Sequence, residues 1–321
     1  MLPSVRILLL LPGFLAQKQQ PVVVERTPVY LPSQPREKPF DVTRRTIQLE
    51  EIQAGGPARD GIPALHHPLF ISSSEADQVL QPSDVVLGVE FAGTSKAYPI
   101  RILNWHEVVN DDVGGQSILI TWCPLCGSGM VYDPYVDGKR LTFGVSGRLY
   151  KHNLLLFDRE TESLWSQLAG QAVSGPLAGT SLRLLPAHLT TWADWKAEYR
   201  TTLVLSFQTG FARDYATDPY RDRPLDRRLS LVVSYRGFTK IYPYAELKKA
   251  GSSLMDQLGG LSFLIEFNSQ TQSVTMRGIA GGNPPNFVAF FAEAKAFYPD
   301  AKVFKAHGRN RDSASTRSPT P

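Results

Sequence analysis

One segment of this chain occurs twice, and the repeat limits the possible folds more than any other feature of the sequence. Residues 89–99 and 233–243 share a valine, a glycine, a lysine, a tyrosine and a proline at a constant spacing of 144 residues. A second match, Gly-Gly-x-Ser-x-Leu-Ile, stands at 114–120 and again at 259–265, with one residue inserted. Two matches in the same order are hard to produce by chance. The sequence therefore predicts two copies of a strand–turn–strand–short helix–strand unit.

The segments around these matches indicate a mainly β protein. Residues 85–91 and 96–102 are apolar runs on either side of an Ala-Gly-Thr-Ser turn, which is typical of a hairpin. Helical patterns are confined to 193–199, 244–258 and 286–297. We expect a mainly β fold with a few short helices, in which two related strand-rich units pack as one globular body. Further strands are predicted at 117–122, 129–132, 141–145, 154–158, 163–167, 203–208 and 231–235.

The two ends of the chain differ in composition from its middle. Arg6 precedes a short apolar run, which predicts a signal peptide over 1–16, no transmembrane segment and an extracytoplasmic location, periplasmic or secreted. The alternatives are an apolar N-terminal strand and a wrongly chosen start codon. The remaining boundaries follow from composition and from the repeat. We predict a Pro-rich linker or surface arm at 17–57, the first unit at 58–220, a second, degenerate unit at 221–307 and a disordered tail at 308–321.

Charge and composition exclude one class of partner. Apolar residues make up 42% of the chain and charged residues 20%, as in ordinary globular proteins with a core. The net charge of +4 is spread thinly, and no Lys/Arg block stands beside a row of aromatic residues. We therefore expect no nucleic-acid partner.

The two cysteines of the chain are its most chemically informative residues. They lie in Trp-Cys-Pro-Leu-Cys-Gly at 122–127, so Cys123 and Cys126 can close a small disulfide, cycle as a dithiol or bind a metal. His106 precedes them by one predicted strand, and neighbouring strands would bring it within reach of the pair. The second copy lacks all three residues, so they are not needed to build the unit. Its matching positions hold Ala250, Asn268 and Thr271.

Metal binding is the leading prediction for these residues. Two thiolates and an imidazole are good ligands for copper or zinc. We therefore predict a Cys2His site formed by Cys123, Cys126 and His106, used in metal handling or in metal-dependent catalysis. The fourth ligand would be water, a substrate or a neighbouring side chain. The candidates nearest in sequence are His152, Met130 and Glu107.

Two other functions are open for the same residues. The pair could act as a thiol–disulfide oxidoreductase, with Cys123 attacking, Cys126 resolving and His106 stabilising the thiolate. Gly-Ser-Gly at 127–129 disfavours a helix after the pair, so the scaffold would not be that of thioredoxin. A binding module with a static disulfide is the third possibility. Whether the chain is an enzyme is therefore open, and its partner is an unknown small molecule or redox partner.

Polar clusters elsewhere are better explained as capped turns with paired ions. They lie at 146–153, 158–167 and 209–220, and the alternative is that they line a pocket beside the cysteines. The other histidines are expected to be surface or packing residues. These are His66, His67, His188 and His307.

Together these motifs resemble an uncharacterised bacterial family, domain of unknown function 3179. The likeness runs from about 61 to 220, and more loosely to about 307. Members often carry export signals, which agrees with residues 1–16, and the family brings no established reaction. His152 stands where the resemblance implies other polar residues. The marks of the resemblance are Asn-Trp-His-Glu at 104–107, the cysteine motif at 122–127, Ser-Gly at 146–147, Asp-Arg at 158–159, Ser-Leu-Trp-Ser-Gln at 163–167 and Thr-Trp at 191–192.

Overall fold

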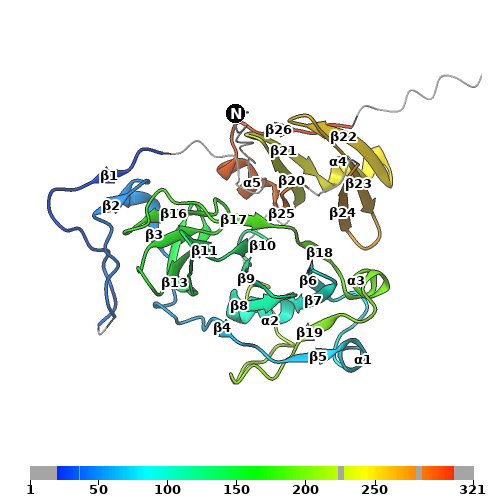
Figure 1. Ribbon diagram of the computed structural model, residues 1–321, viewed down its shortest axis with the longest axis horizontal. Helices are drawn as coiled ribbons and strands as arrows, with labels where there is room; N and C mark the ends of the chain where they lie inside the picture. Colours follow the sequence, from blue (N-terminus) through cyan, green and yellow to red (C-terminus); the bar gives the residue numbers. More distant parts are fainter. Residues whose placement is uncertain (1–19, 36, 223–227, 280–283, 307–321) are drawn as a thin grey trace, which may run out of the picture.

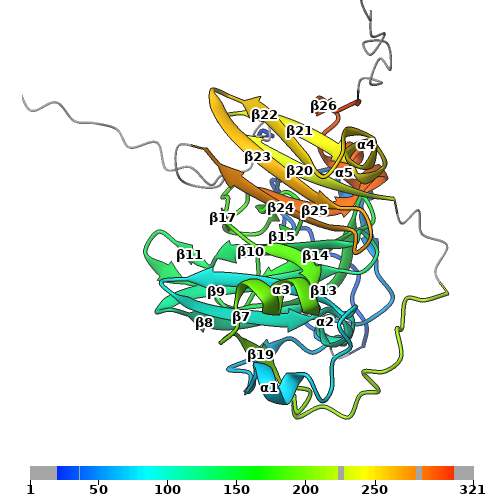
Figure 2. The ribbon, with the colours of Figure 1, turned by 90° about the vertical axis from the view of Figure 1, so that its right-hand side faces the viewer.

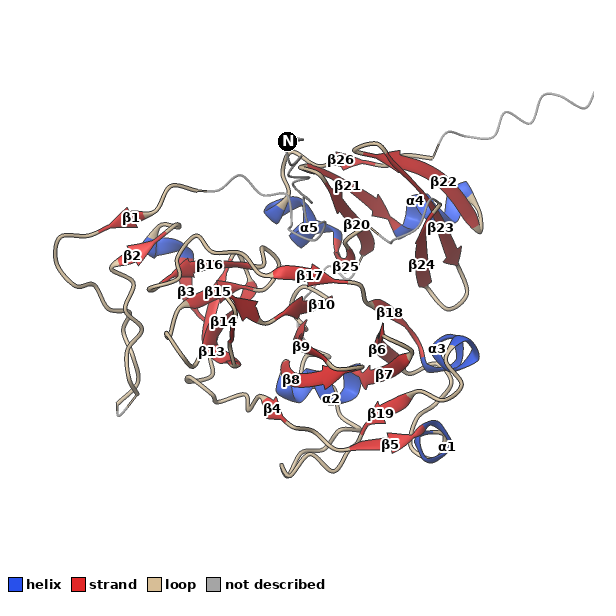
Figure 3. Cartoon of the chain, in the orientation of Figure 1, coloured by secondary structure: helices blue, strands red, loops and turns tan. Residues whose placement is uncertain are grey.

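A computed structural model describes residues 20–35, 37–222, 228–279 and 284–306 (Figure 1). Strands dominate this part of the chain, and five short α-helices lie among them (Figure 3). The protein is therefore mainly β, as predicted. The predicted signal peptide at 1–16 and the predicted tail at 308–321 fall outside the described residues. Among the residues that are described, no helix has the length and apolar character needed to cross a membrane.

The first series of elements begins with a hairpin and a short helix. The hairpin turn holds Ala92 and Gly93 at φ 49° and 78°, the positive values that a two-residue type I′ turn needs. Pro99 ends the hairpin, and a helix follows at once. The elements are β6 (Val85–Phe91), β7 (Thr94–Pro99), α2 (Ile100–His106), β8 (Val108–Val113), β9 (Gln116–Cys123) and β10 (Ser128–Asp133), and later β18 (His188–Thr191), α3 (Trp192–Glu198) and β19 (Leu203–Leu205).

A second series near the C-terminus follows the same order of elements. Its hairpin turn holds Arg236 and Gly237 at φ 47° and 85°, and a helix again follows directly after a proline, Pro243. The elements are β20 (Leu229–Tyr235), β21 (Phe238–Pro243), α4 (Tyr244–Ala250), β22 (Ser253–Leu258), β23 (Leu261–Asn268), β24 (Ser273–Gly278), β25 (Asn286–Phe290), α5 (Phe291–Phe297) and β26 (Lys302–Val303).

One large sheet runs through both series and joins them. The join is the antiparallel pairing of β10 with β25 through Gly129 and Val288. Figure 2 shows the second series as an upper layer above the strands of the first. Two smaller sheets lie beside this one, in the orders β18-β6-β7-β19-β5 (Phe70–Ser72) and β22-β23-β24. The order in the large sheet is β26-β21-β20-β25-β10-β9-β8-β4 (Leu65–His66), with β17 (Arg183–Leu185) beside β10.

The segment predicted as a linker or arm contributes three short strands to a separate seven-stranded sheet. Phe40 and Val42 are buried and share an apolar cluster with Leu155 and Phe157. The sheet order is β1 (Val23–Val24), β2 (Arg44–Arg45), β16 (Gln171–Ser174), β15 (Leu164–Ser166), β14 (Asn153–Asp158), β13 (Phe143–Tyr150) and β3 (Ile52–Ala54). The remaining short elements are a 3-10 helix at Leu49–Glu51, α1 (Ser73–Ala76), β11 (Tyr135–Val136) and β12 (Lys139–Arg140).

The helix predicted at 244–258 is only half a helix. It ends at Ala250, because Gly251 takes φ 114° and the chain leaves the helical path. Residues Ser253–Leu258 then pair with β23 as a strand, with side chains alternating between exposed and partly covered positions. The helical pattern of this segment comes from its first seven residues alone.

Two other predicted boundaries are wrong for a similar reason. The helix predicted at 286–297 begins only at Phe291, and its first five residues pair with β20 as β25. The strand predicted at 96–102 ends at Pro99, and its last residues form the start of α2. In both places a strand passes directly into a helix, so one apolar run contains two elements with different periods.

β9 separates two apolar cores, and this decides where the site residues lie. Side chains of successive strand residues point to opposite faces of a sheet. Leu119 and Cys123 belong to the core that contains Trp165, whereas Ile120 and Trp122 belong to the core that contains Tyr98. The cysteine side and the tryptophan side of β9 are therefore different environments.

Candidate functional site

The two cysteines lie at the ends of the tight turn that joins β9 to β10. The backbone N–H of Cys126 donates to the carbonyl oxygen of Cys123 at 3.1 Å, and Pro124 takes the second position, where its fixed φ fits. Both thiols are free, and the two residues are 1% and 0% exposed. Such a turn brings its first and fourth Cα atoms within about 7 Å, close to the range that a disulfide spans.

The sulfur of Cys126 contacts three polar groups. Its S–H faces the carbonyl oxygen of His152 at 3.6 Å, and Nδ2 of Asn153 faces the sulfur at 3.5 Å. The thiol of Cys123 is near enough to the same sulfur to raise the pKa of the Cys126 thiol. The orientation of the Asn153 amide is fixed, because its Oδ1 accepts the backbone N–H of Leu168 at 2.9 Å. Asn153 therefore presents a donor, not an acceptor, to the sulfur.

Asn153 belongs to a buried network of uncharged polar side chains. Its Nδ2 also donates to Oε1 of Gln167 at 2.8 Å, and the hydroxyl of Ser128 donates to the same oxygen at 2.9 Å. Nε2 of Gln167 donates to Oγ1 of Thr121 at 3.2 Å and to the carbonyl oxygen of Ser128 at 3.0 Å. All four residues are fully buried. A satisfied network of this kind holds the amide donor rigidly against the cysteine.

The electrostatic environment keeps the Cys126 thiol protonated. Burial raises the pKa of this thiol well above its ordinary value of 9.0, because a thiolate loses hydration in the core. The neighbouring Cys123 and the carboxylate of Glu293 raise the pKa further, and the hydrogen bond from Asn153 acts in the opposite direction. The Cys126 thiol therefore needs a base to take its proton before the sulfur can react as a thiolate.

The second series covers the cysteine turn. At the end of β25, the N–H of Phe290 donates to the carbonyl oxygen of Cys126 at 2.7 Å. The ring of Phe290 packs so closely over Gly127 that a Cβ there would lie 2.4 Å from it. Glu293 is on the first turn of α5, directly after this contact. The cysteine turn, which belongs to the first series, is therefore enclosed by residues of the second series.

The structure places His106 on the opposite side of β9 from the cysteines. Its ring bonds through Nδ1 to the carbonyl oxygen of Pro63 at 2.8 Å and through Nε2 to the hydroxyl of Tyr215 at 2.7 Å. Tyr215 belongs to the Trp122 core, whereas both cysteines belong to the other core. In this conformation His106 and the cysteines do not form one centre. No three Asp, Glu, His or Cys side chains gather as a metal site within the described ranges.

The hydrogen bonds of His106 settle the role of each ring nitrogen. A carbonyl oxygen can only accept, so Nδ1 donates to Pro63, and Nε2 of the neutral ring accepts the hydroxyl proton of Tyr215. Burial lowers the pKa of His106, the bond to Pro63 raises it, and Arg213 lowers it again. The neutral ring therefore ties Tyr215 to the end of α2.

The whole Asn-Trp-His-Glu motif binds the segment 209–220, one of the clusters interpreted as capped turns. Every one of its four side chains contacts this segment. The bonds are Asn104 Nδ2 to Asp218 Oδ1 (3.2 Å), Trp105 Nε1 to the Thr217 carbonyl oxygen (3.1 Å), His106 Nε2 with the Tyr215 hydroxyl (2.7 Å) and the Tyr220 hydroxyl to Glu107 Oε1 (2.7 Å). The motif anchors a long loop, and Asn104 links it to the cysteine strand by accepting the Trp122 indole N–H at 2.7 Å.

Glu107 supplies the carboxyl group of this motif. It caps α2 at φ 57°, and its side chain is buried. Burial raises the pKa of Glu107 to about 7, and the hydrogen bond from Tyr220 only partly opposes this effect. Glu107 is therefore bound to Tyr220 on the loop side, away from the cysteines.

The other predicted ligands have separate positions. Met130 faces the same side of the sheet as Cys123, because Met130 pairs with Thr121 and Ser128 pairs with Cys123. His152 contributes its backbone carbonyl oxygen, not its ring, to Cys126. Of the remaining histidines, His66 lies 3.4 Å from the Asn110 amide and His188 lies near Trp195, whereas His307 is outside the described residues. His67 occupies a left-handed turn position at φ 49°.

Sequence reasoning interpreted two residues of this site as parts of capped turns, with a pocket beside the cysteines as the alternative, and did not identify a third. Asn153 and Gln167 lie in the polar clusters at 146–153 and 158–167, but their link to Cys126 depends on the pairing of β13 with β14 and β14 with β15. Glu293 lies in a predicted helix with no local signal of function. The likeness of its segment, Phe-Ala-Glu-Ala-Lys-Ala at 291–296, to Trp-Ala-Asp-Trp-Lys-Ala at 192–197 is the one signal that could have drawn attention to it.

A family model described as "Protein of unknown function (DUF3179)" matches residues 59–235, more than half of the chain. The chain belongs to this family. The matched region contains both cysteines, the Asn-Trp-His-Glu motif, Asn153 and Gln167, so the DUF3179 region includes the buried pair and its polar network. Phe290 and Glu293, which cover the pair, lie beyond it. No curated protein and no solved structure matches the chain.

Proposed function

We propose that Cys123 and Cys126 are a redox-active pair that alternates between a dithiol and a disulfide. The observation that carries this proposal is the position of the two cysteines at the ends of one tight turn, in which the N–H of Cys126 donates to the carbonyl oxygen of Cys123. Closing a disulfide across such a turn fits its backbone geometry. The proposed export of the chain would place the pair in a compartment where disulfides persist.

The substrate class is a molecule that carries a disulfide. The thiolate of Cys123 attacks one substrate sulfur, the substrate S–S bond breaks, and one thiolate leaves. Cys126 then attacks the sulfur of Cys123, the mixed disulfide breaks, and the second thiolate leaves. The two protons of the pair pass to the departing thiolates. The protein is oxidised by two electrons, and the substrate disulfide is reduced to two thiols.

Glu293 and Asn153 have distinct roles in this proposal. Cys126 holds its proton until the second step, because the pKa of its thiol is raised. The carboxylate of Glu293 accepts that proton as the new S–S bond forms. The fixed N–H donor of Asn153 stabilises the sulfur while it carries negative charge.

We further propose that the two series are copies of one ancestral unit. The first six elements of each series have lengths of 7, 6, 7, 6, 8 and 6 residues in the same order. The parallel pairings also agree, since Leu203 pairs with Lys96 in the first series and Lys302 with Lys240 in the second. Agreement of element order, length and register supports a duplication.

A side-chain cluster of the same composition supports the duplication independently. In each series a lysine and a tyrosine of the second hairpin strand donate to one aspartate of the strand after the helix. An aromatic ring lies against the lysine in both. The contacts are Lys96 Nζ and Tyr98 hydroxyl to Asp111 Oδ2 (2.9 and 2.6 Å), and Lys240 Nζ and Tyr242 hydroxyl to Asp256 Oδ2 (2.6 and 2.9 Å).

The contact between the copies supports the role given to Glu293. Just as α5 lies over the cysteine turn, α3 lies over the turn between β23 and β24. There Oδ2 of Asp194 accepts the hydroxyl protons of Thr271 and Ser273, both at 2.9 Å. Asp194 is the third residue of α3 and Glu293 the third residue of α5, and Thr271 matches Cys126 in the repeat. Each copy thus places a carboxylate over the other's turn.

Binding of copper or zinc by the same thiols is a second candidate, and one observation favours it. Met130 shares the core of the two cysteines, and its sulfur accepts the Tyr132 hydroxyl at 3.5 Å. Two thiolates and a thioether are soft ligands that suit copper(I). His106 would join such a site only after its ring had left Pro63 and Tyr215.

A redox titration of the full-length protein tests the proposal. The thiols would be alkylated after equilibration in thiol–disulfide buffers and counted by mass. We expect one transition that involves both cysteines, with a midpoint above about −300 mV. Cys126→Ser should accumulate a mixed disulfide at Cys123 with a small disulfide substrate, and His106→Asn should leave the midpoint unchanged.

Two results would contradict the redox proposal. One is a pair that stays fully reduced or fully oxidised over the whole range of buffers, which would favour a static role. The other is uptake of about one copper(I) or zinc ion per reduced chain that blocks alkylation and is lost in Cys123→Ser. That second result would favour the metal site.

A further inference from the structure

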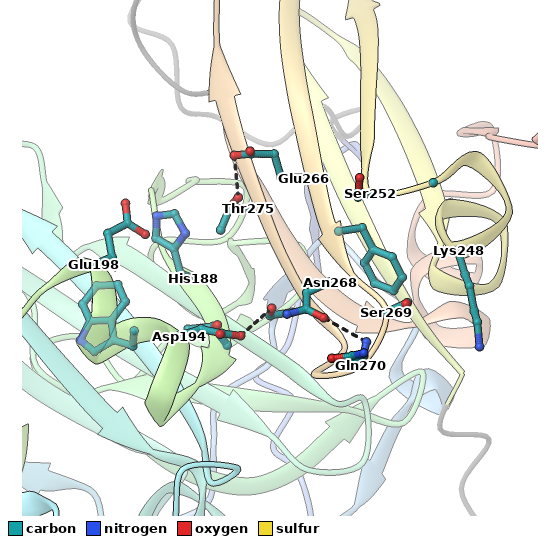
Figure 4. Close-up of a pocket in the computed structure, with 15 residues that line it drawn as sticks. His188, Asp194, Glu198, Lys248, Ser252, Glu266, Asn268, Ser269, Gln270 and Thr275 are labelled. Carbon is teal, nitrogen blue, oxygen red and sulfur yellow. Dashed lines mark hydrogen bonds between the residues drawn. The ribbon is translucent and has the colours of Figure 1, made fainter.

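A cavity of about 610 Å³ lies between the two series, on the side of α3, and its lining combines polar side chains with the rings of Trp195 and Phe267 (Figure 4). One wall comes from β18 and α3 of the first series, and the other comes from β23, β24 and the residues between them. Its volume is in the range of pockets that hold small-molecule ligands. Both walls contribute polar side chains to the lining, whereas the cysteines and their polar network are fully buried.

The wall from the second series offers fixed hydrogen-bonding groups. Oδ1 of Asn268 accepts the backbone N–H groups of Gln270 and Thr271 at 3.0 and 3.3 Å, which leaves its Nδ2 donor for another partner. Glu266 lies further along the same strand, where Thr275 donates to Oε2 at 3.4 Å (Figure 4). This wall therefore offers the carboxylate of Glu266 and the amide donor of Asn268.

The wall from the first series adds a carboxylate and an imidazole. The hydroxyls of Thr271 and Ser273 both donate to Oδ2 of Asp194. These bonds fix the orientation of the Asp194 carboxylate at the edge of the cavity. His188 and Glu198 stand next to each other on this side (Figure 4). Burial lowers the pKa of His188, with a smaller opposing effect from Glu198, so the ring is neutral and offers one donor and one acceptor.

We propose that this cavity binds a sugar of one or two rings that is neutral or carries an amino group. Each sugar hydroxyl both donates and accepts, so it pairs with a wall on which carboxylates, an amide and an imidazole alternate. The carboxylates of Asp194, Glu198 and Glu266 outnumber the cations by one, since Lys248 lines the cavity and Arg277 lies 3.6 and 3.7 Å from Glu198 and Glu266. This charge balance disfavours sugars that carry a carboxylate.

Isothermal titration of the full-length protein with three matched sugars tests the proposal. Glucose, glucosamine and glucuronate share one ring and differ in charge. We expect glucose and glucosamine to bind with dissociation constants of about 1 mM or below, and glucuronate to bind at least about tenfold more weakly. Asn268→Ala and Glu266→Gln should each weaken glucosamine binding by about tenfold.

Gln272→Ala is the matched control, because Gln272 lies on the same turn as Asn268 but does not line the cavity. It should bind as the unaltered protein does, and thermal unfolding would check that all variants are folded. Failure of all three sugars to bind would overturn the proposal. Binding of glucuronate as tightly as glucose would overturn it as well. Neither result bears on the cysteine pair, whose test measures thiols.

Discussion

The amide nitrogen of Asn153 lies 3.5 Å from the sulfur of Cys126 and is held there by bonds on both sides of the amide group. Oδ1 is occupied by the backbone N–H of Leu168, so the amide cannot flip without losing a buried hydrogen bond. A buried donor that is fixed in this way favours the anionic form of the sulfur it faces. The remaining environment favours the thiol. The reactivity of Cys126 therefore depends on the balance between these opposing effects.

Removing the amide should shift this balance toward the thiol. In a Cys123→Ser background, Asn153→Ala is expected to move the midpoint of Cys126 alkylation upward by about one pH unit, which corresponds to about 1.4 kcal/mol. The rate of iodoacetamide labelling against pH measures this. Asn286→Ala serves as the control, because the Asn286 amide bonds to the carbonyl oxygen of Pro284 and not to the cysteine. A midpoint that does not move would show that Asn153 has no influence on the thiol.

Removing the charge of Glu293 should shift the balance the other way. The negative carboxylate raises the pKa of Cys126, so Glu293→Gln is expected to lower the midpoint of Cys126 alkylation. The same change should slow resolution of the mixed disulfide by about tenfold or more, since the base for the second step is lost. Asp194→Asn makes the matched change at the other turn and should alter neither quantity. Equal effects of the two substitutions would point to general loosening of the contact between the two series of elements.

Glu107 should make stability depend on pH in the acid range. Its folded pKa is about 7 and its ordinary value is 4.5, so the folded state holds the proton more tightly than the unfolded state does. The stabilisation is complete below pH 4.5 and is lost as pH rises toward 7, with a total of about 3 kcal/mol. Urea unfolding between pH 4 and 8 measures this dependence. Glu107→Gln keeps an acceptor for Tyr220 and should flatten the curve over this range, and an unchanged slope would contradict the assignment.

Gly127 should control access to the cysteines. Its φ of 56° strains any other residue, and an added Cβ would meet the ring of Phe290 at 2.4 Å. Gly127→Ala is therefore expected to displace β25 and to speed the reaction of the thiols with an aromatic disulfide reagent by about tenfold, through easier local opening. Gly93→Ala is the control, because Gly93 also has positive φ but no atom lies within 4 Å of an added Cβ. Equal rates in the two variants would show that the contact between Gly127 and Phe290 does not limit the exposure of the thiols.

Local sequence predicted the parts of the fold that depend on neighbouring residues. The Ala-Gly-Thr-Ser segment between β6 and β7 forms the predicted turn, because Ala92 and Gly93 supply the two positive φ values that the hairpin needs. Strand-to-helix transitions at Pro99 and Phe290 were placed wrongly, because one apolar run serves both elements. A period cannot be read from a run that changes its period halfway.

The candidate site depended on contacts that the local sequence does not contain. The backbone of Glu107 does lie beside Trp122, as expected for neighbouring strands. The ring of His106 nevertheless turns to the other face, because α2 ends there and Tyr215, far along the chain, supplies its partner. The enclosure by Phe290 is equally remote in sequence. The two cysteines could be recognised as candidate site residues from the sequence. Their environment could not be predicted, because it is formed by residues that are remote in sequence.

The enclosure of the cysteine turn by β25 has a consequence for the order of synthesis. Phe290 and Glu293 follow Cys126 by more than 160 residues. Both cysteines therefore leave the ribosome long before the residues that cover them have been translated. Small oxidants and metal ions can reach the nascent segment during that interval. When the final helix docks, it seals in whatever oxidation state or ligand the sulfurs have acquired by then.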